Sequence, residues 1–88
     1  MRTVWKFPLS IGGRQALRMP VDAEILCLQA QHDQLCLWAL VSPDAPTQEV
    51  WFLVTGTGFE LQDECLRYVG TAQVCGGAFV WHVFRIVA

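Results

Sequence analysis

The chain has 88 residues and a formal net charge of −2, and 53% of its residues are hydrophobic whereas only 16% are charged. This length corresponds to one domain spanning residues 1–88. The negative net charge argues against nucleic acid as a partner, because such binding depends on neutralising phosphates. No apolar run approaches the roughly 20 residues of a membrane helix, and the start lacks the apolar stretch of a signal peptide. We therefore expect a cytoplasmic protein with no membrane partner.

The apolar content is high for so short a chain. A domain of this size buries only about 60% of the surface that its unfolded chain exposes, so much apolar area stays at the surface. Symmetric association with further copies is a common way to cover such area. We therefore expect a homodimer or a higher homo-oligomer.

Alternation of side-chain character predicts strands from the start of the chain. The first spans residues 3–9, and Pro8 restricts it to a sheet edge or ends it, because proline cannot donate to a ladder. A glycine-containing turn at residues 11–14 leads to a short second strand at residues 15–19, which Pro20 stops.

A hairpin follows, formed by residues 24–31 and 34–41 around a His32-Asp33 turn. Its second strand is apolar on both faces, which predicts a central strand that is covered on both sides. Residues 49–55 are apolar on both faces as well, and they form the next predicted strand.

Gly56-Thr57-Gly58 then breaks the chain, and residues 59–64 are acidic and irregular, with room for one helical turn. Residues 66–74 and 78–87 form the last hairpin around a glycine pair that suits a positive-φ turn. Six to seven short strands at this spacing are typical of an all-β fold, a small antiparallel β-sandwich or a partly open barrel.

The side chains that usually carry chemistry form no recognisable catalytic or metal-binding set. Cysteines occur at positions 27, 36, 65 and 75, and none belongs to a C-x-x-C pair. With a two-residue His32-Asp33 turn Cys27 lies opposite Trp38, and Cys36 lies diagonally on the same face. A turn shifted by one pair of residues would instead place Cys27 directly opposite Cys36. We expect these two thiols to be reduced and buried as small apolar side chains, with a metal or redox site as the alternative. Because no nucleophile–base pair or open metal site can be named, the sequence predicts a non-enzymatic protein without a cofactor.

Three residues are candidates for binding a small anionic ligand. Arg14 and Arg18 belong to an N-terminal segment that contains basic residues and no acidic ones. Arg14 also follows a glycine pair whose backbone N–H groups, together with its guanidinium, suit an anion. His82 lies inside the apolar final strand, where a hydrogen-bonded core histidine is commoner than a base or a ligand.

Four aromatic residues are candidates for an interface, namely Trp5, Phe7, Trp51 and Trp81. All lie on predicted strands, and packing in the core or against a partner explains them. No basic run is interleaved with the tryptophans, so we do not expect them to stack on nucleic-acid bases.

Five sequence blocks, spread over most of the chain, carry a resemblance to a known family. They are VWKFPL at 4–9, LWALVSPDA at 37–45, GTG at 56–58, YVGT at 68–71 and GGAFVWHVF at 76–84. Together they resemble small bacteriophage and prophage proteins of a domain of unknown function. This chain differs from that pattern in continuing through residues 85–88 and in carrying extra cysteines. The resemblance implies a viral accessory protein in the host cytoplasm and carries no established activity.

These observations favour a non-enzymatic binding protein, a phage accessory factor that engages a host protein, with a defence component among the candidates. Two alternatives stay open. A symmetric oligomer could enclose an anionic nucleotide signal between subunits, with Arg14, Arg18 and aromatic residues lining the pocket. The chain could instead be a structural or assembly protein of the virion.

Overall fold

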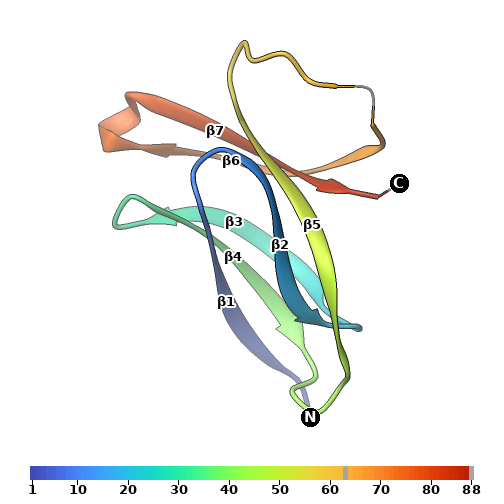
Figure 1. The fold of residues 1–88 in the computed structure, drawn as a ribbon. Helices are drawn as coiled ribbons and strands as arrows, with labels where there is room; N and C mark the ends of the chain where they lie inside the picture. Colours follow the sequence, from blue (N-terminus) through green and yellow to red (C-terminus); the bar gives the residue numbers. More distant parts are fainter. Residues whose placement is uncertain (63, 88) are drawn as a thin grey trace.

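The computed structural model describes residues 1–62 and 64–87, and it contains two antiparallel β-sheets (Figure 1). The strands are β1 (Thr3–Leu9), β2 (Gly13–Pro20), β3 (Glu24–Gln31), β4 (Gln34–Val41), β5 (Thr47–Gly56), β6 (Leu66–Val74) and β7 (Phe79–Ile86). The prediction of an all-β fold with six to seven strands is therefore confirmed. Within the described ranges no helix is long and apolar enough to cross a membrane.

The one helical turn of the described residues is a 3-10 turn at Cys75–Gly77, in the last hairpin. The sequence allowed such a turn within residues 59–64 instead. There the described residues are irregular, and Asp63 lies outside them. The helical turn forms where the chain has three consecutive positive φ angles, at Cys75, Gly76 and Gly77, as the predicted positive-φ hairpin requires.

The core lies between a three-stranded sheet of order β1-β4-β3 and a four-stranded sheet of order β2-β5-β7-β6. Alternate residues of each strand point inward, which gives the period of two expected for strands with one buried face. The largest fully buried side chains are Phe52, Leu9, Met19, Leu35, Leu37, Val41, Val54, Val74 and Val83. Leu28 of β3 belongs to the same cluster, so every strand contributes to the core.

The β3–β4 hairpin has the predicted turn and register. His32 and Asp33 have φ angles of 51° and 63°, as the favoured two-residue hairpin turn requires. Cys27 pairs with Trp38, as predicted, and the ladder continues in that register to the turn. Toward the start of β3 the register shifts between Ile25 and Cys27, where a β-bulge adds one residue.

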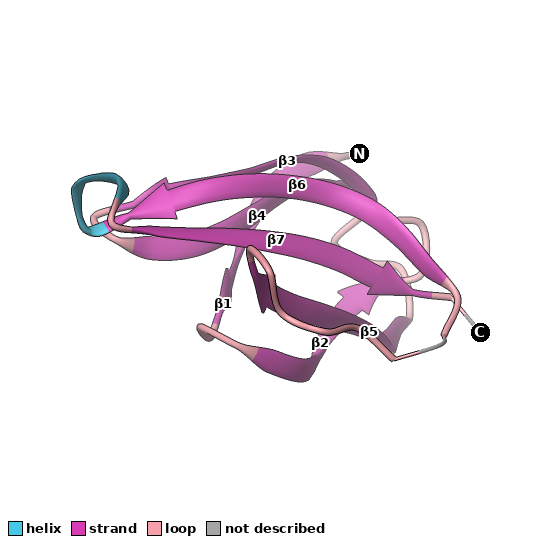
Figure 2. Ribbon diagram, turned by 90° about the horizontal axis from the view of Figure 1, so that it is seen from above, coloured by secondary structure: helices cyan, strands magenta, loops and turns pink. Residues whose placement is uncertain are grey.

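The two sheets meet closely along β3 and β6, which belong to different sheets and lie side by side (Figure 2). A Cβ atom on Gly70 of β6 would lie only 2.9 Å from the Cβ of Leu28 on β3. At the hairpin tips the Cys75 backbone N–H donates to Asp33 Oδ1 at 2.9 Å. On the opposite side β1 and β2 are sheet edges, so the prediction that Pro8 restricts β1 to an edge is confirmed.

The prediction that the strands apolar on both faces are covered on both sides is wrong within this chain. Strands β4 and β5 do lie inside their sheets, but the described residues form only two sheets, with no third layer over the outer faces of these strands. On β4 Trp38 is only partly buried, and on β5 Trp51 is 46% exposed. The surplus apolar residues of the sequence therefore lie largely on outer faces and edges.

The cysteines are free thiols, and of the two that were predicted to be buried only Cys36 is fully so. Cys36 is buried and Cys27 is half-buried, both on the outer face of the three-stranded sheet. Cys65 and Cys75 are exposed, because they lie in the β5–β6 connection and in the β6–β7 turn rather than within strands.

A side-chain hydrogen bond joins the β2–β3 turn to the end of β4. The Ser42 hydroxyl donates to Asp22 Oδ2, and the Ser42 backbone N–H donates to Asp22 Oδ1 at 3.3 Å. These hydrogen bonds, chiefly the one from the hydroxyl, hold the pKa of Asp22 below its usual value. The carboxylate therefore stabilises the fold above its ordinary pKa, and this stabilisation is lost as the pH falls through its lowered pKa.

We expect Asp22→Asn to be less stable than the wild type at neutral pH, because the charged acceptor of Ser42 is lost. The difference should shrink as the pH falls below about 4, where the unfolded and then the folded wild type take up a proton at this carboxyl. Urea unfolding of both proteins between pH 7 and pH 2.5 measures this. A difference that stays constant over the range would contradict the assignment.

Candidate functional site

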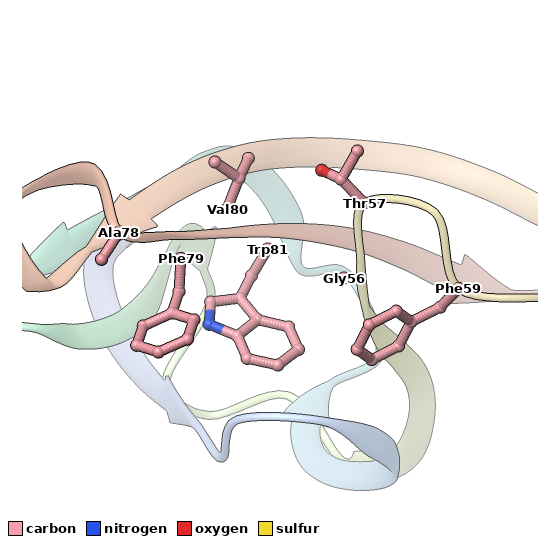
Figure 3. A pocket seen from close by; sticks show the side chains of 7 residues that line it. All are labelled: Gly56, Thr57, Phe59, Ala78, Phe79, Val80 and Trp81. Carbon is pink, nitrogen blue, oxygen red and sulfur yellow. The ribbon is translucent and has the colours of Figure 1, made fainter.

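An aromatic pocket of about 240 Å³ opens where β5 ends and β7 begins (Figure 3). Its lining consists of Gly56, Thr57, Phe59, Ala78, Phe79, Val80 and Trp81. The rings of Phe59, Phe79 and Trp81 point to one side of β7, whereas Thr57 and Val80 point to the other (Figure 3). That side continues the inner face of the sheet, because Trp81 pairs with Gly56 just beyond the buried pair Val54–Val83.

Gly56 makes room for the ring of Phe59. A Cβ atom at this position would lie 2.9 Å from two carbons of that ring. With glycine there, Phe59 packs edge-to-face on Trp81, with ring centroids 6.1 Å apart and an interplanar angle of 88°, the geometry that aromatic quadrupoles favour. Phe59 is nevertheless 62% exposed and Phe79 is 55% exposed, so apolar ring surface faces the opening.

The indole nitrogen of Trp81 is buried and has no hydrogen-bond partner among the described residues. A buried donor left unpaired costs about 1–3 kcal/mol, so this N–H is an unfavourable feature of the chain alone. In Figure 3 the nitrogen lies on the side of the indole that is turned toward Phe79.

His82 lies on the outer face of the sheet, behind the pocket, and its hydrogen bonds hold the segment after β5 in place. Its Nε2 lies 2.7 Å from Thr57 Oγ1 and its Nδ1 lies 2.9 Å from Thr71 Oγ1. The hydroxyl of Tyr68 lies 2.6 Å from Thr71 Oγ1 and extends this network. His82 is thus hydrogen-bonded, as expected, but the expectation of a core position is wrong, because the residue pairs with Thr55 on the outward side of the ladder. It is a positioning residue for the segment that carries Phe59.

The predicted anion-binding arginines do not meet at one cleft. The Arg14 guanidinium forms an ion pair with Glu64 at 2.7 Å, and its side chain is 48% exposed. The Arg18 guanidinium donates to the backbone oxygen and the hydroxyl of Thr47, both at 3.3 Å. Arg14 lines a cavity beside the β5–β6 connection that neither Arg18 nor His82 lines. Ligand binding by these three residues stays a prediction.

The four predicted interface residues do not all line the aromatic pocket. Trp5 and Phe7 project from the edge strand β1 with ring centroids 6.4 Å apart, and Trp51 projects from the outer face of β5. Of the four, only Trp81 lines the aromatic pocket. Phe59 and Phe79 were not among the sequence candidates. A phenylalanine directly after Gly-Thr-Gly was the available signal for Phe59, but only the path of the loop brings it to Trp81.

The two sheets and the pocket define a small β-sandwich protein with a surface site suited to an apolar group. Residues 1–87 match the family described as "Domain of unknown function (DUF7352)", and the chain belongs to that family. The predicted membership of a domain family of unknown function is confirmed at this level, whereas the viral origin stays a prediction. No curated protein and no solved structure gave a significant match to the chain.

Proposed function

We propose that this protein is a non-enzymatic binding module whose aromatic pocket receives an apolar side chain of a partner polypeptide. The observation that carries the proposal is the buried Trp81 Nε1, which has no acceptor within the described chain although it lies at the wall of an open apolar pocket. A polypeptide offers both complements at once, an apolar side chain for the rings and a backbone carbonyl for the indole N–H.

The size and composition of the pocket support a side chain as the occupant. Pockets for drug-sized molecules usually have about 300–1,000 Å³, so the pocket is small for such a ligand. Aromatic residues are enriched at protein interfaces and among the few side chains that carry most of the binding energy. The exposed rings of Phe59 and Phe79 extend the apolar surface beyond the opening, which gives a partner backbone a surface to lie on.

The resemblance to small phage and prophage proteins suggests a host protein as the partner and the host cytoplasm as the place of binding. A component of host defence fits an accessory role of this kind. In this proposal the chain acts by binding its partner and blocking the bound surface, without a catalytic step of its own.

Removal of the Phe79 ring should weaken partner binding strongly with little effect on folding, because this ring is half exposed at the pocket mouth. We expect Phe79→Ser to lower recovery of one host protein from a bacterial lysate by about tenfold or more, as loss of an interface anchor of 1.4 kcal/mol or more would do. Trp81→Phe, which keeps a ring and deletes the N–H donor, should lower recovery of the same protein. Quantitative mass spectrometry of the captured proteins measures both.

Trp51→Ser is the matched control, because Trp51 is an aromatic residue that is 46% exposed, much like Phe79, but it projects from the outer face of β5 and does not line the pocket. The partner should be recovered in full with this variant and should bind the purified wild-type protein. Equal recovery with all variants would contradict a role of the pocket. A second copy of the chain as the occupant would show instead as a dimer that Phe79→Ser dissociates in sedimentation equilibrium.

A further inference from the structure

Two arginines line a second cavity, which we call the arginine cleft. It has a volume of about 260 Å³ and is lined by Ala23, Ile25, Arg67, Tyr68, Val69 and Arg85. Arg85 pairs with the buried Phe52 on β5, which places it on the inner face of the four-stranded sheet. The cleft therefore lies between the sheets and is separate from the aromatic pocket.

Two β-bulges explain why a cavity forms at this place. The register of β3 shifts between Ile25 and Cys27, and that of β6 shifts between Tyr68 and Gly70. Beside the bulges, Leu28 and Gly70 hold the two strands in close contact. Bulges bend a strand and redirect its side chains, so the strands separate beyond this contact and leave space between Ile25 and Val69.

The charges in the cleft are unbalanced within the described chain. Arg67 lies directly opposite Arg85 in the β6–β7 ladder, and like charges in such pairs are destabilising. Among residues 1–62 and 64–87, neither guanidinium has a carboxylate within ion-pair distance or a hydrogen-bond acceptor. By contrast, Arg14 forms an ion pair with Glu64, and Arg18 donates a hydrogen bond to Thr47. The arrangement thus concentrates positive charge and N–H donors at one opening.

The acidic residues next to the lining in sequence do not neutralise it. Asp22 accepts hydrogen bonds from Ser42 at the neighbouring turn. Glu24 pairs with Leu40 in the three-stranded sheet. The next pair, Ile25–Ala39, faces inward, and because successive side chains alternate between the two faces, Glu24 faces outward. Since no carboxylate of the described residues complements the two guanidinium groups, the cleft suits an anion from outside the chain.

We propose that the arginine cleft binds a compact phosphomonoester. Such a group carries a charge of about −1.5 to −2 at neutral pH, which matches two arginines that stay protonated. The planar guanidinium fork pairs with phosphate oxygens in a bidentate manner. The apolar walls, Ala23, Ile25 and Val69, suit the organic part of the ester, and the small volume restricts that part to one ring or a short chain.

Isothermal titration calorimetry with phenyl phosphate at fixed ionic strength tests the proposal. Wild-type protein should bind phenyl phosphate at least about tenfold more tightly than phenyl sulfate, which has the same ring but a single charge. Arg67→Gln and Arg85→Gln should each weaken phenyl phosphate binding by about 10-fold to 100-fold, the loss expected for one charged hydrogen-bonding group. Arg18→Gln, on the outer face of the other edge strand, should bind as the wild type does.

Three results would overturn the proposal: no binding of phenyl phosphate to folded wild type at millimolar concentration, equal binding of the two esters, or equal weakening by Arg18→Gln. Circular dichroism shows whether each variant is folded. Arg85→Lys, which keeps the charge and loses the fork, serves as the second variant and should also weaken binding. Since neither arginine lines the aromatic pocket, these results are independent of the capture of a partner protein.

Discussion

Replacement of Phe52 by alanine is expected to lower the free energy of unfolding by about 3–5 kcal/mol. Phe52 is fully buried in the middle of β5, between Gln15 of β2 and Arg85 of β7 in the ladder. Its removal takes away a large buried ring and leaves a cavity that neighbouring strands cannot close. A domain of this length has a total stability of only about 4–13 kcal/mol, so a large share would be lost. Urea unfolding followed by far-UV circular dichroism measures the change.

The adjacent residue is the control for this substitution. Trp51 belongs to the same strand, but it points to the outer face and is 46% exposed. We expect Trp51→Ala to lower the free energy of unfolding by no more than about 1 kcal/mol, as is usual for substitutions outside the core. Similar losses for the two variants would mean that β5 buries both of its faces, for instance against a second copy of the chain.

Local sequence signals were sufficient to locate the strands. Alternation set the bounds of the first strand and of the β3–β4 hairpin, and turn chemistry set their ends. The His32-Asp33 turn determined the pairing of Cys27 with Trp38, because a two-residue loop leaves one register. These features depend on residues close together in the chain, which is why one sequence predicted them.

Features that depend on contacts distant in sequence were not predictable in the same way. Nothing in the alternation of residues 24–31 marks the bulge at Ile25–Cys27, and nothing there shows that β3 lies against β6. Strands apolar on both faces suggested a further layer, whereas the two-layer fold leaves Trp51 at the surface. The composition signalled surplus apolar area correctly, but only the topology shows where that area lies.

The candidate site likewise combines a feature that local sequence signals predicted with features that depend on contacts distant in sequence. Trp81 was a sequence candidate because a tryptophan in an apolar strand is either core or interface, and it lines the aromatic pocket. Phe59 reaches Trp81 only through the path of the loop after β5, and Arg67 meets Arg85 only through the β6–β7 register. Both depend on which strands are neighbours, and strand order is not encoded in the local pattern.

Gly70→Ala is expected to destabilise the protein by about 1–3 kcal/mol, although the backbone at this position does not have a positive φ. Where the backbone permits it, a change from glycine to alanine usually stabilises by about 0.4–1 kcal/mol, because the unfolded chain loses conformational freedom. At Gly70 the new methyl group would lie 2.9 Å from the Leu28 Cβ, an atom fixed to the β3 backbone. The two sheets would have to separate along β3 and β6.

Gly56→Ala provides the comparison that isolates this effect, since Gly56 is also a strand glycine without a positive φ. Its new methyl group would likewise lie 2.9 Å from a neighbour, but that neighbour is the exposed ring of Phe59, which can rotate away. We expect Gly56→Ala to change the free energy of unfolding by less than about 1 kcal/mol while it displaces Phe59 from the aromatic pocket. If Gly70→Ala were as mild as Gly56→Ala in urea unfolding, the close contact of β3 with β6 could not be what joins the two sheets.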